Sequence, residues 1–105
     1  MTLNDLDTAL NATGYSFAHH AWRHAPAGDY GVYAEDEGDD FLADGGHAEK
    51  ATQGTVDYFT RDDTETPRET IEAALEGLNV PWYLNTVQYE DDTGYIHYEW
   101  VVTVV

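Results

Sequence analysis

The chain has 105 residues, 42% of which are hydrophobic, so it is long and apolar enough to bury a core and is predicted to form one domain over residues 1–105. It contains no cysteine, which excludes disulfides, thiolate nucleophiles and cysteine-ligated zinc. Four basic residues against 21 acidic ones give a formal net charge of −17, which argues against direct nucleic-acid binding because contacts to phosphates need lysine and arginine.

Two elements are predicted at the start of the chain. The segment Thr2 to Ala12 has leucines at helical spacing and is followed by Gly14, which together predict a short amphipathic helix. The segment Tyr15 to Trp22 is aromatic and alternating, which predicts a strand. Because side chains alternate along a strand, His19 and His20 are expected to point to opposite faces of the sheet.

The middle of the chain predicts two more strands with acidic turns between them. The strands are expected over Tyr30 to Glu35 and His47 to Thr60. Asp36 to Asp40 is charged and centred on a glycine, which is typical of a turn or loop. Asp44 to Gly46 has the composition of a hairpin turn.

The strongest helix signal follows these strands. Thr66 and Glu69 have the spacing of a capping box, and the helix is predicted over Pro67 to Leu78. It is expected to end there because Asn79 tolerates the left-handed conformation and Pro81 cannot continue a helix. Its single apolar stripe, which must lie on a sheet, consists of Ile71, Ala74, Leu75 and Leu78.

Two strands joined by a tight turn complete the pattern. They are predicted over Trp82 to Glu90 and Tyr95 to Val105, with the hairpin turn at Asp91 to Gly94. One face of the first strand is expected to carry Trp82, Leu84 and Thr86. One face of the second is expected to carry Tyr98, Trp100, Val102 and Val104. The order α-β-β-β-α-β-β and the short loops predict an α+β fold, a mostly antiparallel sheet packed by two helices.

The sequence offers little to catalysis or metal binding. Its metal-ligand candidates are His19, His20, His24 and His47 with Asp44. No HExxH motif is present and the first two of these point apart, so surface or structural roles are expected and no metal or cofactor is predicted. A nucleophile elbow, a phosphate loop, a dinucleotide fingerprint and a calcium-loop pattern are all missing, and the chain is therefore predicted not to be an enzyme.

The aromatic strands suggest protein partners instead. Because each strand alternates, some tyrosines must face outward, and the run Val101 to Val105 is apolar on both faces, so a lone domain is expected to leave a β-prone end exposed. The expected protein interface comprises Tyr33, Phe41, Tyr98, Trp100 and Val102. The expected acidic surface comprises Glu35, Asp36, Glu37, Asp39, Asp40 and Asp44.

Several segments together carry a family resemblance. Besides the short N-terminal helix they are TGY at Thr13 to Tyr15, YGVYAEDEGDDFLADG at Tyr30 to Gly45, VDYFTRD at Val56 to Asp62, IEAALEGLNVPW at Ile71 to Trp82 and YEDDTGYIHYEWVVTV at Tyr89 to Val104. In them the chain resembles the small tail-completion proteins of long-tailed bacteriophages, the tail terminator or tail-to-head joining group. The resemblance implies a sheet backed by helices, assembled as a ring, usually a hexamer, with no catalytic residues.

The function expected from the resemblance is structural. A tail terminator caps the tail tube, meets the head–tail connector proteins, and is found in the virion and, during assembly, in the host cytoplasm. Acidic residues lining such a ring would repel DNA and let the genome slide. Size and acidity also permit an acidic DNA-mimic inhibitor of the anti-CRISPR or anti-restriction type, or an acid-rich domain adapted to salt. No apolar run approaches a membrane span, so no membrane association is expected.

Overall fold

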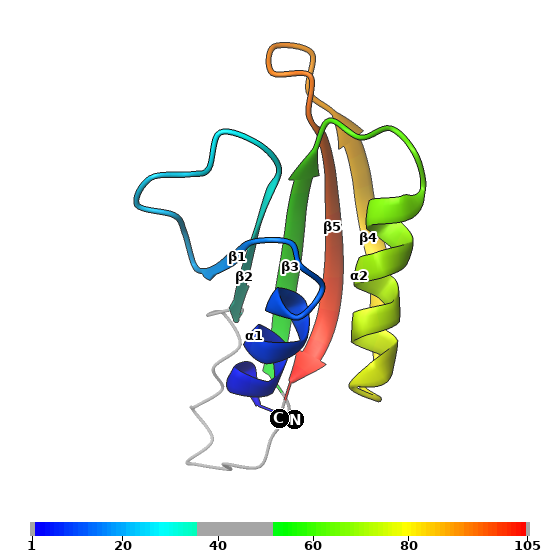
Figure 1. Ribbon diagram of the computed structural model, residues 1–105. Helices are drawn as coiled ribbons and strands as arrows, with labels where there is room; N and C mark the ends of the chain where they lie inside the picture. The colour runs from blue at the N-terminus through cyan, green and yellow to red at the C-terminus, as the bar shows by residue number, and fades with distance from the viewer. Residues whose placement is uncertain (1, 36–51, 105) are drawn as a thin grey trace.

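The structure is a computed structural model that describes residues 2–35 and 52–104. In this part of the chain two helices and five strands follow in the predicted order, and the α+β class is confirmed (Figure 1). The elements are α1 (Leu3–Asn11), β1 (Phe17–His19), β2 (Tyr30–Glu35), β3 (Thr52–Thr60), α2 (Thr66–Gly77), β4 (Trp82–Tyr89) and β5 (Ile96–Val104). Neither of these helices is long and apolar enough to cross a membrane.

The described strands form one sheet in the spatial order β1-β2-β3-β5-β4. Every neighbouring pair is antiparallel except β1 and β2, which are parallel. Strand β5 is hydrogen-bonded on both sides, to β3 and to β4. The expectation that the last strand leaves an exposed β-prone end is therefore wrong for Val101 and Val102, which are both buried.

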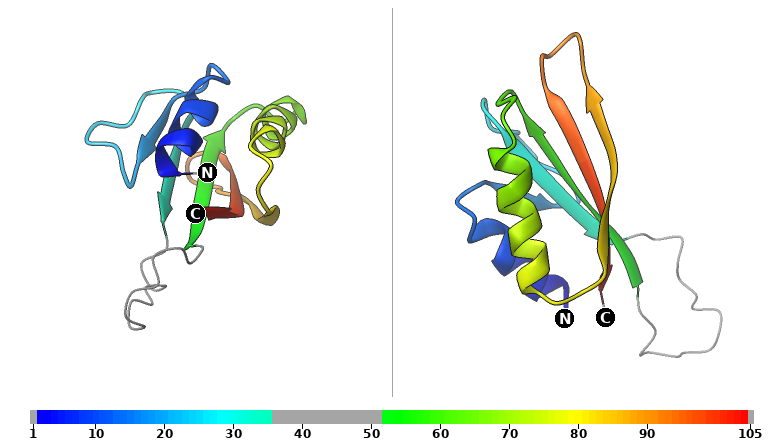
Figure 2. Two further views of the ribbon diagram at one scale, coloured as in Figure 1. Left: turned by 90° about the horizontal axis from the view of Figure 1, so that it is seen from below. Right: turned by 90° about the vertical axis from the view of Figure 1, so that its right-hand side faces the viewer.

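Both helices pack on the same face of the sheet and leave the other face uncovered (Figure 2). The predicted stripe of α2 is confirmed, because Ile71 and Leu75 are fully buried and Leu78 packs at the margin. The face of β5 that carries Tyr98, Trp100 and Val102 lies beneath the helices, as predicted. The core combines residues from both helices and from the sheet: Leu6, Leu10, Phe17, Tyr33, Val56, Tyr58, Ile71, Leu75, Tyr98, Trp100 and Val102.

The capping box lies on α1 rather than on α2. The Thr2 hydroxyl accepts a hydrogen bond from the Asp5 amide (3.2 Å), and the Asp5 carboxylate accepts one from the Thr2 amide (3.0 Å). The predicted box at the start of α2 is wrong, because that helix is capped by Glu65 without a side-chain hydrogen bond. Before this helix the Thr64 amide donates to the Asp62 carboxylate and closes a turn, and the helix then begins at Thr66, one residue earlier than predicted.

The turn residues that end the elements behave as predicted. Gly14 after α1 has φ 92° and Asn79 after α2 has φ 60°. Between β4 and β5, Gly94 has φ 79° and its amide donates to the Glu90 carbonyl (2.8 Å). These are positions where the left-handed region is required, and glycine or asparagine reaches it at the least steric cost.

Strand β1 is shorter than predicted. Only Phe17–His19 pairs with β2, because His20 takes φ 70° and turns the chain out of the sheet. Trp22 lies beyond the turn, and its indole N–H donates to the Gly31 carbonyl (2.8 Å). Gly31 faces Phe17 in the parallel pair, and a Cβ there would overlap the phenyl ring. The lack of a side chain at this position is thus what allows Phe17 to enter the core.

Strand β4 contains a register shift that its alternating sequence did not predict. Leu84 pairs with Trp100, but Thr86 pairs with Glu99, so one extra residue is accommodated between them. The expectation that Thr86 shares a face with Trp82 and Leu84 is therefore wrong, since a bulge reverses the alternation after it. The bulged Asn85 donates its side-chain amide to the Glu99 carboxylate (3.1 Å).

Of the predicted third strand, Thr52–Thr60 is present as β3. The remaining predicted residues of that strand, the acidic segment Asp36 to Asp40 and the turn Asp44 to Gly46 lie outside the described residues.

Candidate interaction surface

Four of the five residues expected at a protein interface lie in the core. The exposed fractions of Tyr33 and Tyr98 are 6%, that of Trp100 is 0% and that of Val102 is 1%. Their common face was predicted correctly for β5, but that face meets the helices and offers no contact area to a partner. The expected interface is therefore wrong for these four residues in the monomer. Phe41 lies outside the described residues.

Glu35 is the described member of the expected acidic surface. It is half-buried at the end of β2, and its carboxylate accepts a hydrogen bond from the His19 imidazole (2.7 Å). This hydrogen bond is the main cause that lowers the pKa of Glu35 below its ordinary value. The other expected residues, Asp36, Glu37, Asp39, Asp40 and Asp44, lie outside the described residues.

The exposed apolar side chains of the described chain gather on β4 instead. Tyr83, Val87 and Tyr89 have exposed fractions of 55%, 51% and 66%. Strand β4 is the outermost described strand on its side of the sheet, so one row of its backbone N–H and C=O groups has no strand partner among residues 2–35 and 52–104. No residue from Gly77 to Tyr89 carries a charge. We call this strand, with its exposed side chains, the β4 edge.

A second feature lies on the face that the helices leave uncovered, called the open face below. Tyr30, Phe59 and His97 occupy neighbouring positions on β2, β3 and β5, and their rings stack with centroids 4.9 and 4.2 Å apart. Tyr95 lies edge-on to the first two rings, and the Arg61 guanidinium lies 4.0 Å from the Tyr95 centroid. Aromatic pairs on neighbouring strands stabilise a sheet, and aromatic side chains are also enriched at protein interfaces.

Carboxylates surround the histidine of this aromatic row. His97 Nε2 donates to Asp57 Oδ1 (2.8 Å), and its Nδ1 lies 3.9 Å from the Glu90 carboxylate. The hydrogen bond with Asp57 raises the pKa of His97, burial opposes the shift, and the charges of Asp57, Glu90 and Glu99 add to it. The folded chain thus favours the protonated imidazole.

This raised pKa predicts a pH dependence of stability. Because the folded pKa lies above the unfolded value of about 6.5, the contribution is fully present below that pH and is lost as the pH rises through the folded pKa. Urea unfolding measured at a series of pH values from weakly acidic to weakly alkaline should show the wild-type chain losing more stability than His97→Gln. The control His24→Gln, which alters an exposed histidine, should follow the wild type. Parallel curves for wild type and His97→Gln would contradict the assignment.

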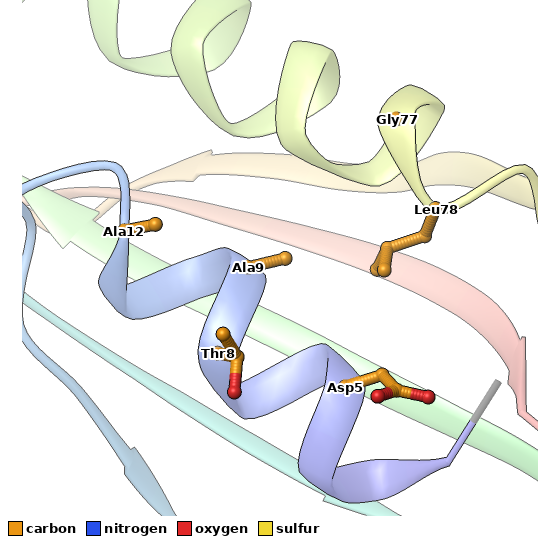
Figure 3. Close-up of a pocket in the computed structure, with 6 residues that line it drawn as sticks. All are labelled: Asp5, Thr8, Ala9, Ala12, Gly77 and Leu78. Carbon is orange, nitrogen blue, oxygen red and sulfur yellow. The ribbon is translucent and has the colours of Figure 1, made fainter.

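A shallow hollow of about 470 Å³ lies between α1 and the end of α2 (Figure 3). It is lined by Asp5, Thr8, Ala9, Ala12, Gly77 and Leu78. Asp5 is its one titratable residue, and that carboxylate is engaged in the capping box of α1. A single occupied carboxylate among small side chains supplies neither an acid–base pair nor a nucleophile. The hollow therefore gives no support to catalysis.

The expectation that His19 and His20 point to opposite faces is wrong. Their rings stack with centroids 3.9 Å apart, and both Nε2 atoms approach the same Glu35 oxygen, at 2.7 and 3.8 Å. The turn at His20 ends the strand alternation on which the expectation rested. The sequence did not predict Glu35 as the partner of these two histidines. The parallel pairing of β1 with β2 brings Glu35 next to them, and the spacing of residues in the sequence does not reveal that pairing.

Comparisons of the chain with protein-family models, with curated proteins and with solved structures gave no match. The resemblance to phage tail-completion proteins thus stays a prediction, and the function has to be argued from the surface itself.

Proposed function

We propose that this chain is a structural protein of a bacteriophage virion, a tail-completion protein of the terminator type that assembles with copies of itself into a ring. Its task is to end the tail tube and to provide the docking surface for the head connector. The observation that supports self-assembly is the β4 edge, an uncharged strand that pairs with β5 on one side and with no described strand on the other, with three exposed apolar side chains on a chain of formal charge −17.

Charge explains why this edge suits a contact between copies. Two molecules that carry many acids repel wherever those acids meet, by about 1 kcal/mol for each close pair in water. No residue of β4 is itself an acid, and the carboxylates beside it, Glu76 and Glu99, accept hydrogen bonds from Trp82 and Asn85. On the open face, Asp57 and Glu90 lie next to the His97 ring of the aromatic row. Monomeric proteins commonly protect an edge strand with charged side chains, and this strand has none. Its unpaired backbone and exposed tyrosines favour lateral pairing with another strand.

The acidity fits the same role. Acids brought together around a ring would repel the DNA backbone, so that a genome could pass without adhering. They would also oppose ring closure, and this opposition depends on ionic strength because the screening length falls from about 30 Å at 0.01 M salt to about 3 Å at 1 M.

Sedimentation velocity at low and high salt tests the proposal. Assembly should strengthen as the salt concentration rises, because screening weakens the repulsion between copies while the apolar edge contact persists. Tyr83→Glu and Val87→Glu should each shift the distribution toward monomer. The matched control is Ala73→Glu, which adds the same charge at an exposed position on α2 and should assemble as the wild type does.

Two outcomes would count against the proposal. A chain that stays monomeric at every salt and protein concentration, also after the tail-tube protein of the same phage is added, contradicts a terminator. If the chain is instead a DNA mimic, its binding to a basic groove of a host enzyme weakens as salt rises, which is the opposite of the trend expected for ring assembly. Equal loss of assembly in Ala73→Glu and Tyr83→Glu would show that the contact does not lie at the β4 edge.

A further inference from the structure

We propose that His19, His20 and Glu35 form a binding site for a divalent transition-metal ion of the zinc type. The site lies where β1 ends beside β2, and it is independent of the assembly proposed above. It rests on three observations: the convergence of the donor atoms, the backbone that produces this convergence, and the chemical nature of the donors.

The donor atoms already lie close together. One ligand atom from each of the three residues can be chosen so that all lie within 4.8 Å of one another. His19 Nε2 and His20 Nε2 approach the same Glu35 oxygen, at 2.7 and 3.8 Å. In a tetrahedral zinc site with bonds of about 2.1 Å, donors lie about 3.4 Å apart. Binding of one ion therefore requires the side chains to rotate so that these separations, at most 4.8 Å, reach that spacing.

The backbone at His20 is what makes the convergence possible. His20 has φ 70°, and the Ala21 amide donates to the His19 carbonyl across it (2.8 Å), which together define a γ-turn of the rare positive-φ type. A second hydrogen bond, from the His20 amide to the Tyr33 carbonyl (2.8 Å), holds this turn against β2. Such strain in a non-glycine residue is concentrated at functional sites. Its effect here is to bring both imidazoles to one carboxylate.

An ion pair between His19 and Glu35 accounts for only part of this arrangement. It explains the 2.7 Å contact, but not why His20 adopts a strained conformation with its ring stacked on His19. The His19 ring also stacks on Tyr33 (5.1 Å), whose hydroxyl donates to Asp7 (2.7 Å). The ligand ring nearest the sheet is thus supported by a fixed neighbour, as preorganised sites require.

The donor set determines the class of ion. Two imidazoles with one carboxylate suit zinc, cobalt, nickel or copper, whereas magnesium and calcium prefer oxygen donors alone. The side chains of His19, His20 and Glu35 are 40%, 52% and 33% exposed. An ion can therefore enter from solvent and keep water on its remaining coordination positions.

The test is calorimetric titration of the untagged, full-length chain with zinc chloride. Wild-type protein should bind one equivalent, and Co²⁺ in its place should give a visible absorption spectrum. His19→Ala and Glu35→Gln should each weaken binding by about tenfold or more, since loss of even an outer-shell partner costs about 10–100-fold. His20→Gly should do the same without disturbing the fold, because glycine adopts the positive φ freely.

The controls separate a built site from general attraction to an acidic surface. His24→Ala removes an exposed histidine outside the cluster and should bind as the wild type does. Mg²⁺ at the same concentration should not displace zinc. Zinc should raise the melting temperature of the wild type more than that of His20→Gly. In EDTA, the melting temperature of His20→Gly should be no lower than that of the wild type. Absence of zinc binding by the wild type, or binding by all three cluster variants that is as tight as that of the wild type, overturns the site.

Discussion

Replacing Trp100 with alanine is expected to lower the free energy of unfolding by about 3–5 kcal/mol. Trp100 is fully buried, its ring stacks on Tyr98 with centroids 5.6 Å apart, and its indole N–H donates to Glu72 Oε2 (2.9 Å). The substitution removes this burial, leaves a cavity and leaves Glu72 without one of its partners. Because domains of this size are stable by only about 5–15 kcal/mol, much of the stability should be lost. Chemical denaturation followed by circular dichroism measures the change.

Two further variants separate packing from hydrogen bonding. Trp100→Phe keeps an aromatic ring but removes the N–H, and it should cost less than Trp100→Ala. Glu72→Leu leaves the buried N–H without its acceptor, which should cost about 1–3 kcal/mol. An unfolding midpoint of Trp100→Ala equal to that of the wild type would show that the side chain is not in the core, and would return it to the candidates for an interface.

Leu75→Ala should cost about 2–5 kcal/mol, the usual range for truncating a buried leucine. Leu75 is fully buried in the middle of the α2 stripe, where the helix lies on the sheet. The comparison variant is Leu78→Ala, which truncates a partly buried leucine at the end of the same stripe and should cost less. Thermal and urea unfolding measure both changes. Equal effects of the two substitutions would mean that α2 does not pack on the sheet through the centre of its stripe.

Local patterns in the sequence predicted most of the elements. The 3.6-residue period of the α2 stripe and the change to alternation at Trp82 are properties of neighbouring residues, so they could be recognised without knowing the fold. The same holds for Asn79 and Gly94, which occupy the left-handed positions expected of them. These positions are decided by backbone sterics, which sequence reports directly.

Features decided by distant residues could not be predicted in this way. The bulge at Asn85 depends on the register with β5. The γ-turn at His20 depends on the Tyr33 carbonyl of the neighbouring strand. Each is a choice between local alternatives that tertiary contacts make.

The β4 edge was not predicted as the interaction surface for a related reason. Alternation correctly grouped Tyr98, Trp100 and Val102 on one face, but it does not say which of two apolar faces the helices will cover. The uncharged run that contains Tyr83 and Val87 was visible in the sequence, whereas its place at the sheet edge follows from the strand order alone. Which side chains are exposed is decided only when the helices pack on the sheet.

The position of β5 also has a consequence for how the chain folds during synthesis. This strand pairs with both β3 and β4, although it follows both of them in the sequence. A nascent chain that has not yet reached Ile96 has nothing to attach β4 to the rest of the sheet, and the facing edges of β3 and β4 stay open. Pairings between distant segments form slowly, and open edges are where partly folded chains aggregate. Interrupting translation before β5 would thus leave β4 as a single strand apart from the β1-β2-β3 part of the sheet, and β4 carries the exposed apolar side chains Tyr83, Val87 and Tyr89.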